Sequence, residues 1–238
     1  MFKNIWFFTA VAISLVLTTP VALLAGLLRL VGLGRVTQGF FVWFAHLWAR
    51  FIIFMTGSRL VVEGMENVPL KGPVCFVGNH QGDFDIIIAL ALIRRPFGFI
   101  AKKETIYIPF IGIWVWLLGG LLMDRNSPRK AMKTIQKGAD DIRRGGAMLI
   151  FPEGTRSKGR GLLPFRAGAF KLATLAEADI VPMAIEDSWR VWEEHRKVKA
   201  VPVTVKFGQA ISTKGLDADG KRALSESLHK CLENMLKV

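Results

Sequence analysis

A histidine and an aspartate, separated by four residues, form the strongest candidate for chemistry in this sequence. His80 and Asp85 lie between two apolar runs, Val74 to Val77 and Ile86 to Ile93. This order predicts a strand, a loop that carries His80, and a buried helix with Asp85 in its first turn, where the helix dipole favours an ionised carboxylate. A carboxylate in contact with imidazole fixes its tautomer and leaves the other ring nitrogen as a general base. The alternative is that Asp83 or Asp85 only caps the helix.

A second polar loop is predicted at Phe151 to Ser157, directly after another short apolar strand. Gly154 permits a tight turn. The planar guanidinium of Arg156 matches the geometry of a phosphate, and Thr155 and the backbone N–H groups add further donors. Two interpretations remain open: a phosphate-binding loop, or an ordinary turn in which Glu153 and Arg156 pair with each other.

Basic residues follow two more predicted strands. Lys102 and Lys103 end the run Phe97 to Ala101, and Arg125 follows Leu121 to Met123. Because loops at the carboxyl ends of parallel strands meet at one edge of a sheet, we expect these cations to gather beside the histidine around a single anionic substrate. Taken singly, each is better explained as a solvated surface charge.

The apolar sequence Val181, Pro182 and Met183 has two interpretations. It lines a slot for an acyl chain, or it belongs to an edge strand, because a proline cannot donate a hydrogen bond to a central ladder. The sequence does not distinguish them.

Short apolar runs that alternate with helical patterns define the fold class. They predict an α/β layer with a largely parallel, mixed sheet of about seven strands flanked by helices. Residues 1–57 are predicted to form hydrophobic membrane-anchoring helices, and residues 58–238 the domain that carries the site. The predicted strands are Leu60 to Val62, Val74 to Val77, Phe97 to Ala101, Leu121 to Met123, Ala147 to Phe151, Ile180 to Ile185 and Val203 to Phe207.

Two later helices show apolar residues at helical spacing. Ser127 followed by Pro128 is typical of a helix start, and Gly145 marks the end of that helix. The inward faces are predicted to be Met132, Ile135, Ala139 and Ile142 in the first helix, and Leu224, Leu228, Cys231, Leu232 and Met235 in the last.

The N-terminus carries two apolar blocks. No residue from Asn4 to Leu28 is charged, which is long enough to cross a hydrocarbon core of about 30 Å. Pro20 is expected to kink or break a helix there, and the glycines between 26 and 34 favour a turn. A straight span and a shallow helical hairpin therefore both fit, and a cleaved secretory signal is a third interpretation.

The second block, Phe40 to Met55, has large side chains at helical spacing. This stripe suits a helix lying in a membrane interface, with Trp43 and Trp48 at the level of the headgroups. The alternative is an ordinary buried helix of a soluble core. The stripe consists of Phe40, Trp43, Phe44, Leu47, Phe51 and Phe54.

The charge balance indicates a polyanionic partner. The formal net charge is +13, from 32 Lys and Arg against 19 Asp and Glu. The first 60 residues contain no acid and 11 of the 25 aromatic residues, which favours membrane lipid over nucleic acid. The two cysteines cannot build a disulfide framework or a four-ligand zinc site.

Four sequence blocks in order resemble the glycerolipid acyltransferases, specifically the 1-acylglycerol-3-phosphate (lysophosphatidate) acyltransferases. They are N-H-x4-D at Asn79 to Asp85, G-x-x-L-M-D-R at Gly119 to Arg125, F-P-E-G-T-R-S at Phe151 to Ser157, and I-V-P-M at Ile180 to Met183. The resemblance covers about residues 58 to 215. Two departures, Gly82 in place of serine and Leu122-Met123 in place of Phe-Ile, bear on the choice of acyl acceptor.

The resemblance implies a reaction at these blocks. His80 would take the proton of the sn-2 hydroxyl of lysophosphatidate, supported by Asp85, while Arg156 and Lys102 or Lys103 hold the phosphate. Acyl-CoA or acyl carrier protein would supply the acyl group, giving phosphatidate for phospholipid biosynthesis. No metal or cofactor is expected, and the sequence lacks the G-x-S-x-G motif of a serine nucleophile.

Other assignments stay open at this point. The acceptor could be glycerol 3-phosphate or another lysophospholipid, and a catalytically silent lipid-binding protein could use the same fold. The sequence does not define the oligomeric state. If the donors are cytosolic, the catalytic domain faces the cytosol, and Lys3, Arg29 and Arg35 fit a hairpin with both ends on that side.

Overall fold

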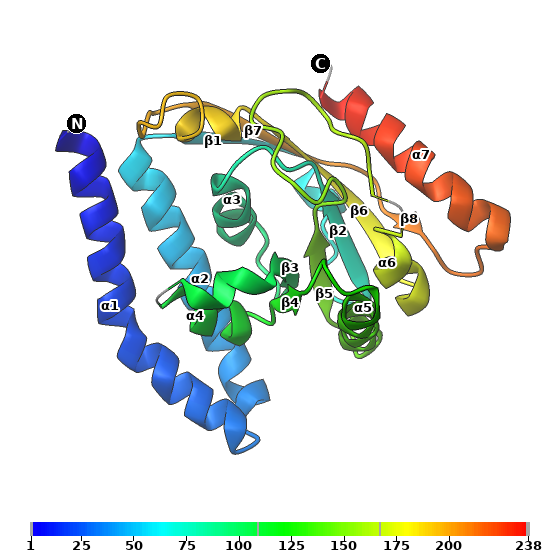
Figure 1. The fold of residues 1–238 in the computed structure, drawn as a ribbon, viewed down its shortest axis with the longest axis horizontal. Coiled ribbons are helices and arrows are strands. Elements are labelled where there is room, and N and C mark those ends of the chain that lie inside the picture. The colour runs from blue at the N-terminus through cyan, green and yellow to red at the C-terminus, as the bar shows by residue number, and fades with distance from the viewer. Residues whose placement is uncertain (1, 109, 167, 237–238) are drawn as a thin grey trace.

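The computed structural model describes residues 2–108, 110–166 and 168–236, and it consists of an N-terminal helical hairpin and one mixed sheet covered by further helices (Figure 1). The strands of the described chain lie in the order β1-β7-β6-β2-β5-β3-β4, with β8 paired to β6. All pairings are parallel except those of β6 with β7 and β8. The strands are β1 Arg59–Glu63, β2 Val74–Gly78, β3 Gly98–Lys102, β4 Leu121–Met123, β5 Ala147–Ile150, β6 Asp179–Glu186, β7 Pro202–Phe207 and β8 Ile211–Ser212.

This sheet confirms the predicted fold class. All seven predicted strands are present within one or two residues of their predicted ends, and only β8 was missed. A strand of two residues is too short to carry a periodic signal.

Helices cover both faces of the sheet (Figure 1). Residues that alternate along β2 point to opposite faces, so Val74 and Phe76 pack with α1, α2 and α3, whereas Cys75 and Val77 pack with α5, α6 and α7. The helices are α1 Phe2–Leu30, α2 Gly34–Thr56, α3 Phe84–Leu92, α4 Ile111–Leu117, α5 Pro128–Arg143, α6 Lys171–Ala176 and α7 Ala218–Leu236, with short 3-10 helices η1 Met65–Asn67, η2 Lys103–Tyr107 and η3 Ser188–Val191.

Helix α5 starts as predicted, since the side chain of Ser127 accepts a hydrogen bond from the Lys130 N–H and Pro128 is the first helical residue. One part of its predicted inward face is wrong. Ala139 and Ile142 are fully buried, but Met132 is 40% exposed. Helical spacing identifies which face turns inward, but not how far along the helix the covering elements reach.

The apolar N-terminus folds as two helices joined by a turn at residues 31–33, where Gly32 has a φ of +85°. Helix α1 continues through Pro20 and bends along its middle (Figure 1), so of the two predicted outcomes, a kink or a break, the helix is bent and not broken. The hydroxyls of Thr18 and Thr19 bond to the carbonyls of Ser14 and Leu15, one turn earlier. The side chains of Lys3 and Arg35, which the topology prediction uses, lie outside the part that the structure describes.

The outer face of this hairpin is apolar and exposed. Most of the predicted stripe of α2 points outward, with Phe54 reaching 79% exposure, while the opposite face of α2, with Ala49 and Ile52, is buried against the domain. A buried helix of a soluble core does not leave such side chains in water, so that alternative is wrong. Both helices are long and apolar enough to cross a membrane, which makes the hairpin a candidate anchor. Trp48 does not lie on the outer face, because its indole N–H donates to Ser14 between the helices.

Candidate active site

His80 and Asp85 are in direct contact. His80 lies in the loop after β2, Asp85 is the second residue of α3, and 2.7 Å separate His80 Nδ1 from Asp85 Oδ2. Asp85 is fully buried, whereas the imidazole is partly exposed. Among the described residues nothing else hydrogen-bonds the ring, so Nε2 has no hydrogen-bond partner there.

The carboxylate of Asp85 is surrounded by donors. Oδ2 also accepts hydrogen bonds from the backbone N–H groups of Gln81 (2.6 Å) and Gly82 (2.9 Å), and Oδ1 accepts one from the hydroxyl of Ser188 (2.5 Å). Asp85 therefore fixes the loop and binds the histidine at the same time, whereas Asp83 makes no side-chain cap to α3. No sequence signal identifies Ser188, which comes 103 residues after Asp85.

An aromatic ring packs against one face of the imidazole. Phe151 stacks on His80 with ring centroids 4.2 Å apart and planes 13° apart. Phe151 and Met183 in turn pack closely on the backbone of Gly78, where an added Cβ would lie 3.2 Å from both side chains. The ring of His80 is thus held between a carboxylate at its edge and an apolar wall at its face.

Backbone hydrogen bonds join the two predicted loops. The N–H of Ser157 donates to the carbonyl of His80 (2.7 Å), and the N–H of Lys158 donates to that of Gln81 (3.1 Å). The buried carboxylate of Glu153 accepts from the N–H groups of His80 (2.7 Å) and Leu163 (3.1 Å). Burial raises the pKa of Glu153, and the two N–H donors oppose that rise.

Glu153 does not pair with Arg156, so that interpretation of the second loop is wrong. Its two oxygens already accept backbone N–H groups, and Arg156 instead pairs with Asp83 and lies 3.7 Å from Glu193. The structure thereby places Arg156 beside the histidine loop, as the convergence argument requires, with acidic residues as its partners.

Glu193 is a site residue that the sequence reasoning missed. Its side chain is 2% exposed, accepts from the N–H of Asp83 (2.6 Å) through Oε1, and leaves Oε2 without a hydrogen-bond partner in the described chain. A Cβ on Gly82 would lie only 2.5 Å from Oε2. The glycine that departs from the family pattern therefore makes room for this carboxylate. Burial raises the pKa of Glu193.

The raised pKa of Glu193 predicts a pH-dependent effect of Glu193→Gln on stability. In the native state the carboxyl group of Glu193 stays protonated above pH 4.5, its usual pKa, whereas in the unfolded state it ionises there. The stability of the wild type therefore falls as the pH rises from 4.5 through the native pKa. Glutamine does not ionise, so the variant does not lose this stability. In thermal unfolding in detergent, the melting temperature of Glu193→Gln relative to that of the wild type should rise with pH and then become constant. Glu226→Gln, at an exposed position on α7, is the control. A pH-independent difference would contradict the prediction.

The predicted cations differ in how closely they join this site. Arg125 donates to the carbonyl of Gly154, which has a φ of +66°, and burial together with nearby Arg166 lowers the pKa of Arg125. Lys103 bonds to Asp124 (3.0 Å), which raises its pKa. Lys102, at the end of β3, is 61% exposed and 3.7 Å from Glu104, and Thr155 is exposed in its loop. Arg125, which follows the outermost strand β4, thus reaches the second loop, whereas the two lysines follow β3, between β4 and β5, and lie beside the acids Glu104 and Asp124.

The Val181, Pro182 and Met183 sequence does not lie on an edge strand, so that interpretation is wrong. It belongs to β6, which pairs with β2 on one side. On the other side β8 pairs with residues 179–180 and β7 begins at Met183, so the missing N–H of Pro182 falls in the gap between two partners. Val181 and Met183 are fully buried. Contact with an acyl chain stays a prediction.

Comparison with known proteins identifies the family of this site. The acyltransferase family model matches residues 59–186, more than half of the chain, and the chain belongs to that family. The match contains the histidine loop, the Phe151 to Ser157 loop and β6.

Relatives narrow the comparison to one named group. The chain is 35% identical over 146 residues to the 1-acyl-sn-glycerol-3-phosphate acyltransferase of Salmonella typhimurium, covering 61% of this chain and 59% of that protein. It is 31% identical to the enzyme of that name from Haemophilus influenzae (68% and 67% covered) and 30% identical to that of Cocos nucifera (82% and 63%). The chain spans about three fifths of the length of the Salmonella relative.

A solved structure has the same fold. The crystal structure of the 1-acyl-sn-glycerophosphate acyltransferase from Thermotoga maritima superposes with a TM-score of 0.84 at 20% identity, covering 98% of this chain and 93% of that one. The coverage includes the N-terminal hairpin, so the arrangement of two helices beside the sheet is common to both chains.

Proposed function

We propose that this protein transfers a fatty acyl group from a thioester to the sn-2 hydroxyl of 1-acylglycerol 3-phosphate. The observation that carries the proposal is the 2.7 Å contact between His80 and Asp85 at a sheet edge that also presents Arg156 and Arg125. The names of the relatives agree with it. Thioester acyl transfer between these substrates needs no metal or prosthetic group.

The proposed chemistry uses one proton carrier. His80 Nε2 takes the proton of the sn-2 hydroxyl, and the oxygen attacks the thioester carbonyl. The C–S bond then breaks, the new ester C–O bond is complete, and the thiolate of acyl-CoA or acyl carrier protein takes the proton back from His80. The buried carboxylate of Asp85 stabilises the imidazolium between the two transfers.

Arg156 is proposed to hold the acceptor phosphate by exchanging partners. In the structure Asp83, which is about half exposed, pairs with Arg156. An incoming phosphate, with more charge and a matching geometry, displaces this carboxylate into water at little cost. Arg125 and Lys102 add positive charge from the neighbouring strands. Docking the phosphate then places the hydroxyl against His80, which converts a bimolecular encounter into a unimolecular step.

Arg156→Ala should raise the KM for lysophosphatidate by about 10- to 100-fold, the equivalent of a charged hydrogen bond of about 1.5–3 kcal/mol. Arg156→Lys keeps the charge but loses the planar pair of donors, so its KM should fall between those of alanine and wild type. Initial rates over a range of acceptor concentrations measure both variants. An unchanged KM in Arg156→Ala would remove Arg156 from the phosphate site.

The membrane side of the proposal rests on exposed apolar surface next to the site. Besides the hairpin, Ile106, Tyr107 and Ile108 are exposed directly after Lys102 and Lys103. This segment and α4, which packs on α1, extend the apolar face toward the proposed phosphate site. A lysophospholipid can therefore reach His80 without leaving the bilayer.

We place the catalytic domain on the cytosolic side of the membrane, where the thioester carriers are found. Protection of residues 29–33 from a protease added on that side of sealed vesicles would contradict this orientation.

One assay tests the function. Purified protein is given labelled acyl-CoA or acyl carrier protein with lysophosphatidate, glycerol 3-phosphate or lysophosphatidylcholine. We expect the highest kcat/KM with lysophosphatidate. Preference for either other acceptor would reassign the substrate, and no transfer to any acceptor by folded protein would leave a lipid-binding protein on this fold.

A further inference from the structure

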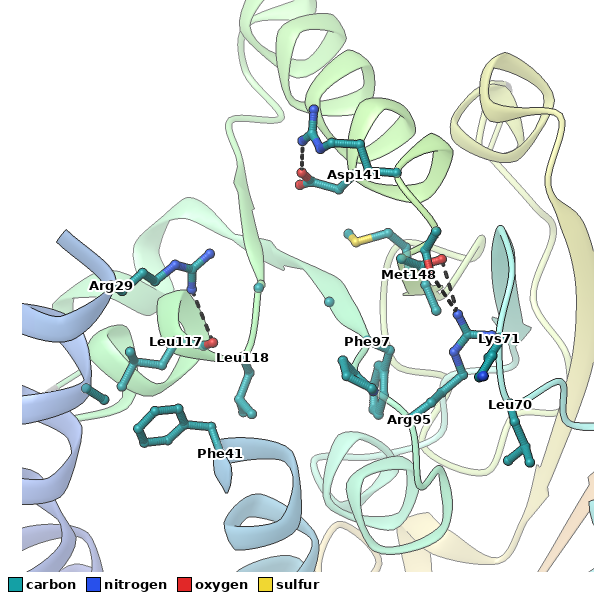
Figure 2. Close-up of a pocket in the computed structure, with 18 of the residues that line it drawn as sticks. Arg29, Phe41, Leu70, Lys71, Arg95, Phe97, Leu117, Leu118, Asp141 and Met148 are labelled. Atoms are coloured by element: carbon teal, nitrogen blue, oxygen red, sulfur yellow. Dashed lines mark hydrogen bonds and ion pairs between the residues drawn. The ribbon is translucent and has the colours of Figure 1, made fainter. Parts of the chain in front are cut away.

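A basic cavity lies at the amino ends of the parallel strands, opposite the strand ends that carry His80. It has a volume of about 710 Å³ and is formed where β2, β3 and β5 begin, beside the end of α1 and the start of α2. Figure 2 shows Arg29 and Phe41 on one side of it and Arg95 and Lys71 on the other. The strands β2, β3 and β5 are four or five residues long, so their two ends lie about 15 Å apart at 3.3 Å per residue. The cavity is therefore separate from the proposed reaction centre.

Arg95 is a buried cation that has no acidic partner in the part of the chain that the structure describes. It is 5% exposed, and its guanidinium donates to four backbone carbonyls. Its Nε is also buried and has no hydrogen-bond partner among the described residues, and burial lowers its pKa with no carboxylate to oppose it. The four carbonyls are those of Pro69 (2.9 Å), Gly72 (2.7 Å), Gly145 (3.3 Å) and Gly146 (3.5 Å). The carbonyls hold the guanidinium but do not neutralise its charge, so an anion in the adjoining cavity would supply the missing counter-charge.

The rest of the lining has the same sign. Lys71, Arg29 and Arg144 add three basic side chains to Arg95, against one acid, Asp141, which already pairs with Arg144. Arg29 is held by the carbonyl of Trp116 (2.7 Å) and by cation–π contact with its ring, so it too has no acidic partner in the described chain. The cavity therefore carries excess positive charge.

The remaining walls are apolar and adjoin the membrane hairpin. Phe41, Leu118 and Met148 line the cavity, and Phe41 belongs to α2. Just beyond the rim, Leu30, Val31 and Leu33 at the end of the hairpin are exposed. A ligand that matches both the basic side chains and the apolar walls of the cavity has an anionic group and an apolar chain.

We propose that this cavity binds the phosphate of an anionic phospholipid, with the headgroup between Arg95 and Lys71 and the chains along Phe41 toward the end of the hairpin. The site is distinct from the one that binds the acyl acceptor, and its occupancy would fix how the hairpin and the sheet edge sit on an anionic bilayer. It does not depend on the proposed acyl transfer.

Calorimetric titration of detergent-purified protein with short-chain dihexanoyl phosphatidylglycerol tests this. We expect saturable binding that Lys71→Glu weakens at least tenfold. Lys71 is exposed, so this variant keeps its fold, whereas Arg95 substitutions remove four buried hydrogen bonds. Lys221→Glu, with the same charge change on α7, and Arg156→Ala, at the reaction centre, should leave this affinity unchanged.

Two further titrants separate the sources of the phosphate. Dihexanoyl phosphatidylcholine, which has no net charge, should bind at least tenfold more weakly, and inorganic phosphate should do the same because it lacks the chains. Equal affinity for inorganic phosphate would overturn the lipid assignment. Binding that Lys71→Glu leaves intact, or that Arg156→Ala abolishes, would overturn the site itself.

Discussion

His80→Ala should lower kcat for acyl transfer by about a thousandfold, in the middle of the range of about 10²- to 10⁴-fold that general base catalysis contributes. The acceptor hydroxyl then has no group to take its proton. The KM for lysophosphatidate should change little, because Arg156 keeps its place. Turnover of labelled acyl donor measures kcat, and thermal unfolding measures the fold.

The structure indicates that this variant stays folded. Without the imidazole, the buried carboxylate of Asp85 keeps three donors, the N–H groups of Gln81 and Gly82 and the hydroxyl of Ser188. His229→Ala is the matched control, since His229 is a partly buried histidine on α7 that contacts Phe165. Turnover of His80→Ala close to that of wild type would exclude the proposed mechanism.

Local sequence patterns predicted the elements that position this site, because each depends on residues close together in the chain. Apolar runs of four or five residues became β2 and β5, and the polar residues that follow them had to lie at one sheet edge. The contact of His80 with Asp85 was predictable for the same reason, since five positions across a loop and a first helical turn restrict the two side chains to the same neighbourhood.

The parts that the sequence did not predict depend on distant segments. Glu193 and Ser188 reach the histidine loop from the segment after β6, and no spacing rule connects positions more than 100 residues apart. The sequence left open whether Arg156 pairs with Glu153, its close neighbour in sequence, because that carboxylate is occupied by backbone N–H groups from two other segments. Pro182 looked like an edge residue because the gap between β7 and β8 is a property of the assembled sheet.

Asp85→Asn should lower kcat by about a hundredfold or more while leaving the KM and the melting temperature near those of wild type. The amide can fit the site. Its oxygen can accept from His80, Gln81 and Gly82 as Oδ2 does now, and its NH2 group can donate to Ser188, whose hydroxyl can reverse its role. What disappears is the negative charge that stabilises the imidazolium formed in the reaction.

This separates the two roles of Asp85, which the structure combines in one carboxylate. If its role were only to brace the loop, Asp85→Asn would keep most of the activity, and only Asp85→Ala, which leaves the N–H groups of Gln81 and Gly82 without an acceptor, would lose it together with stability. Charge stabilisation instead requires Asn and Ala to lose kcat to a similar extent, with a large drop in melting temperature for Ala alone. Ser188→Ala, which removes one donor to the same carboxylate, should cost only a small part of kcat, because two backbone donors and His80 still hold Asp85 in place.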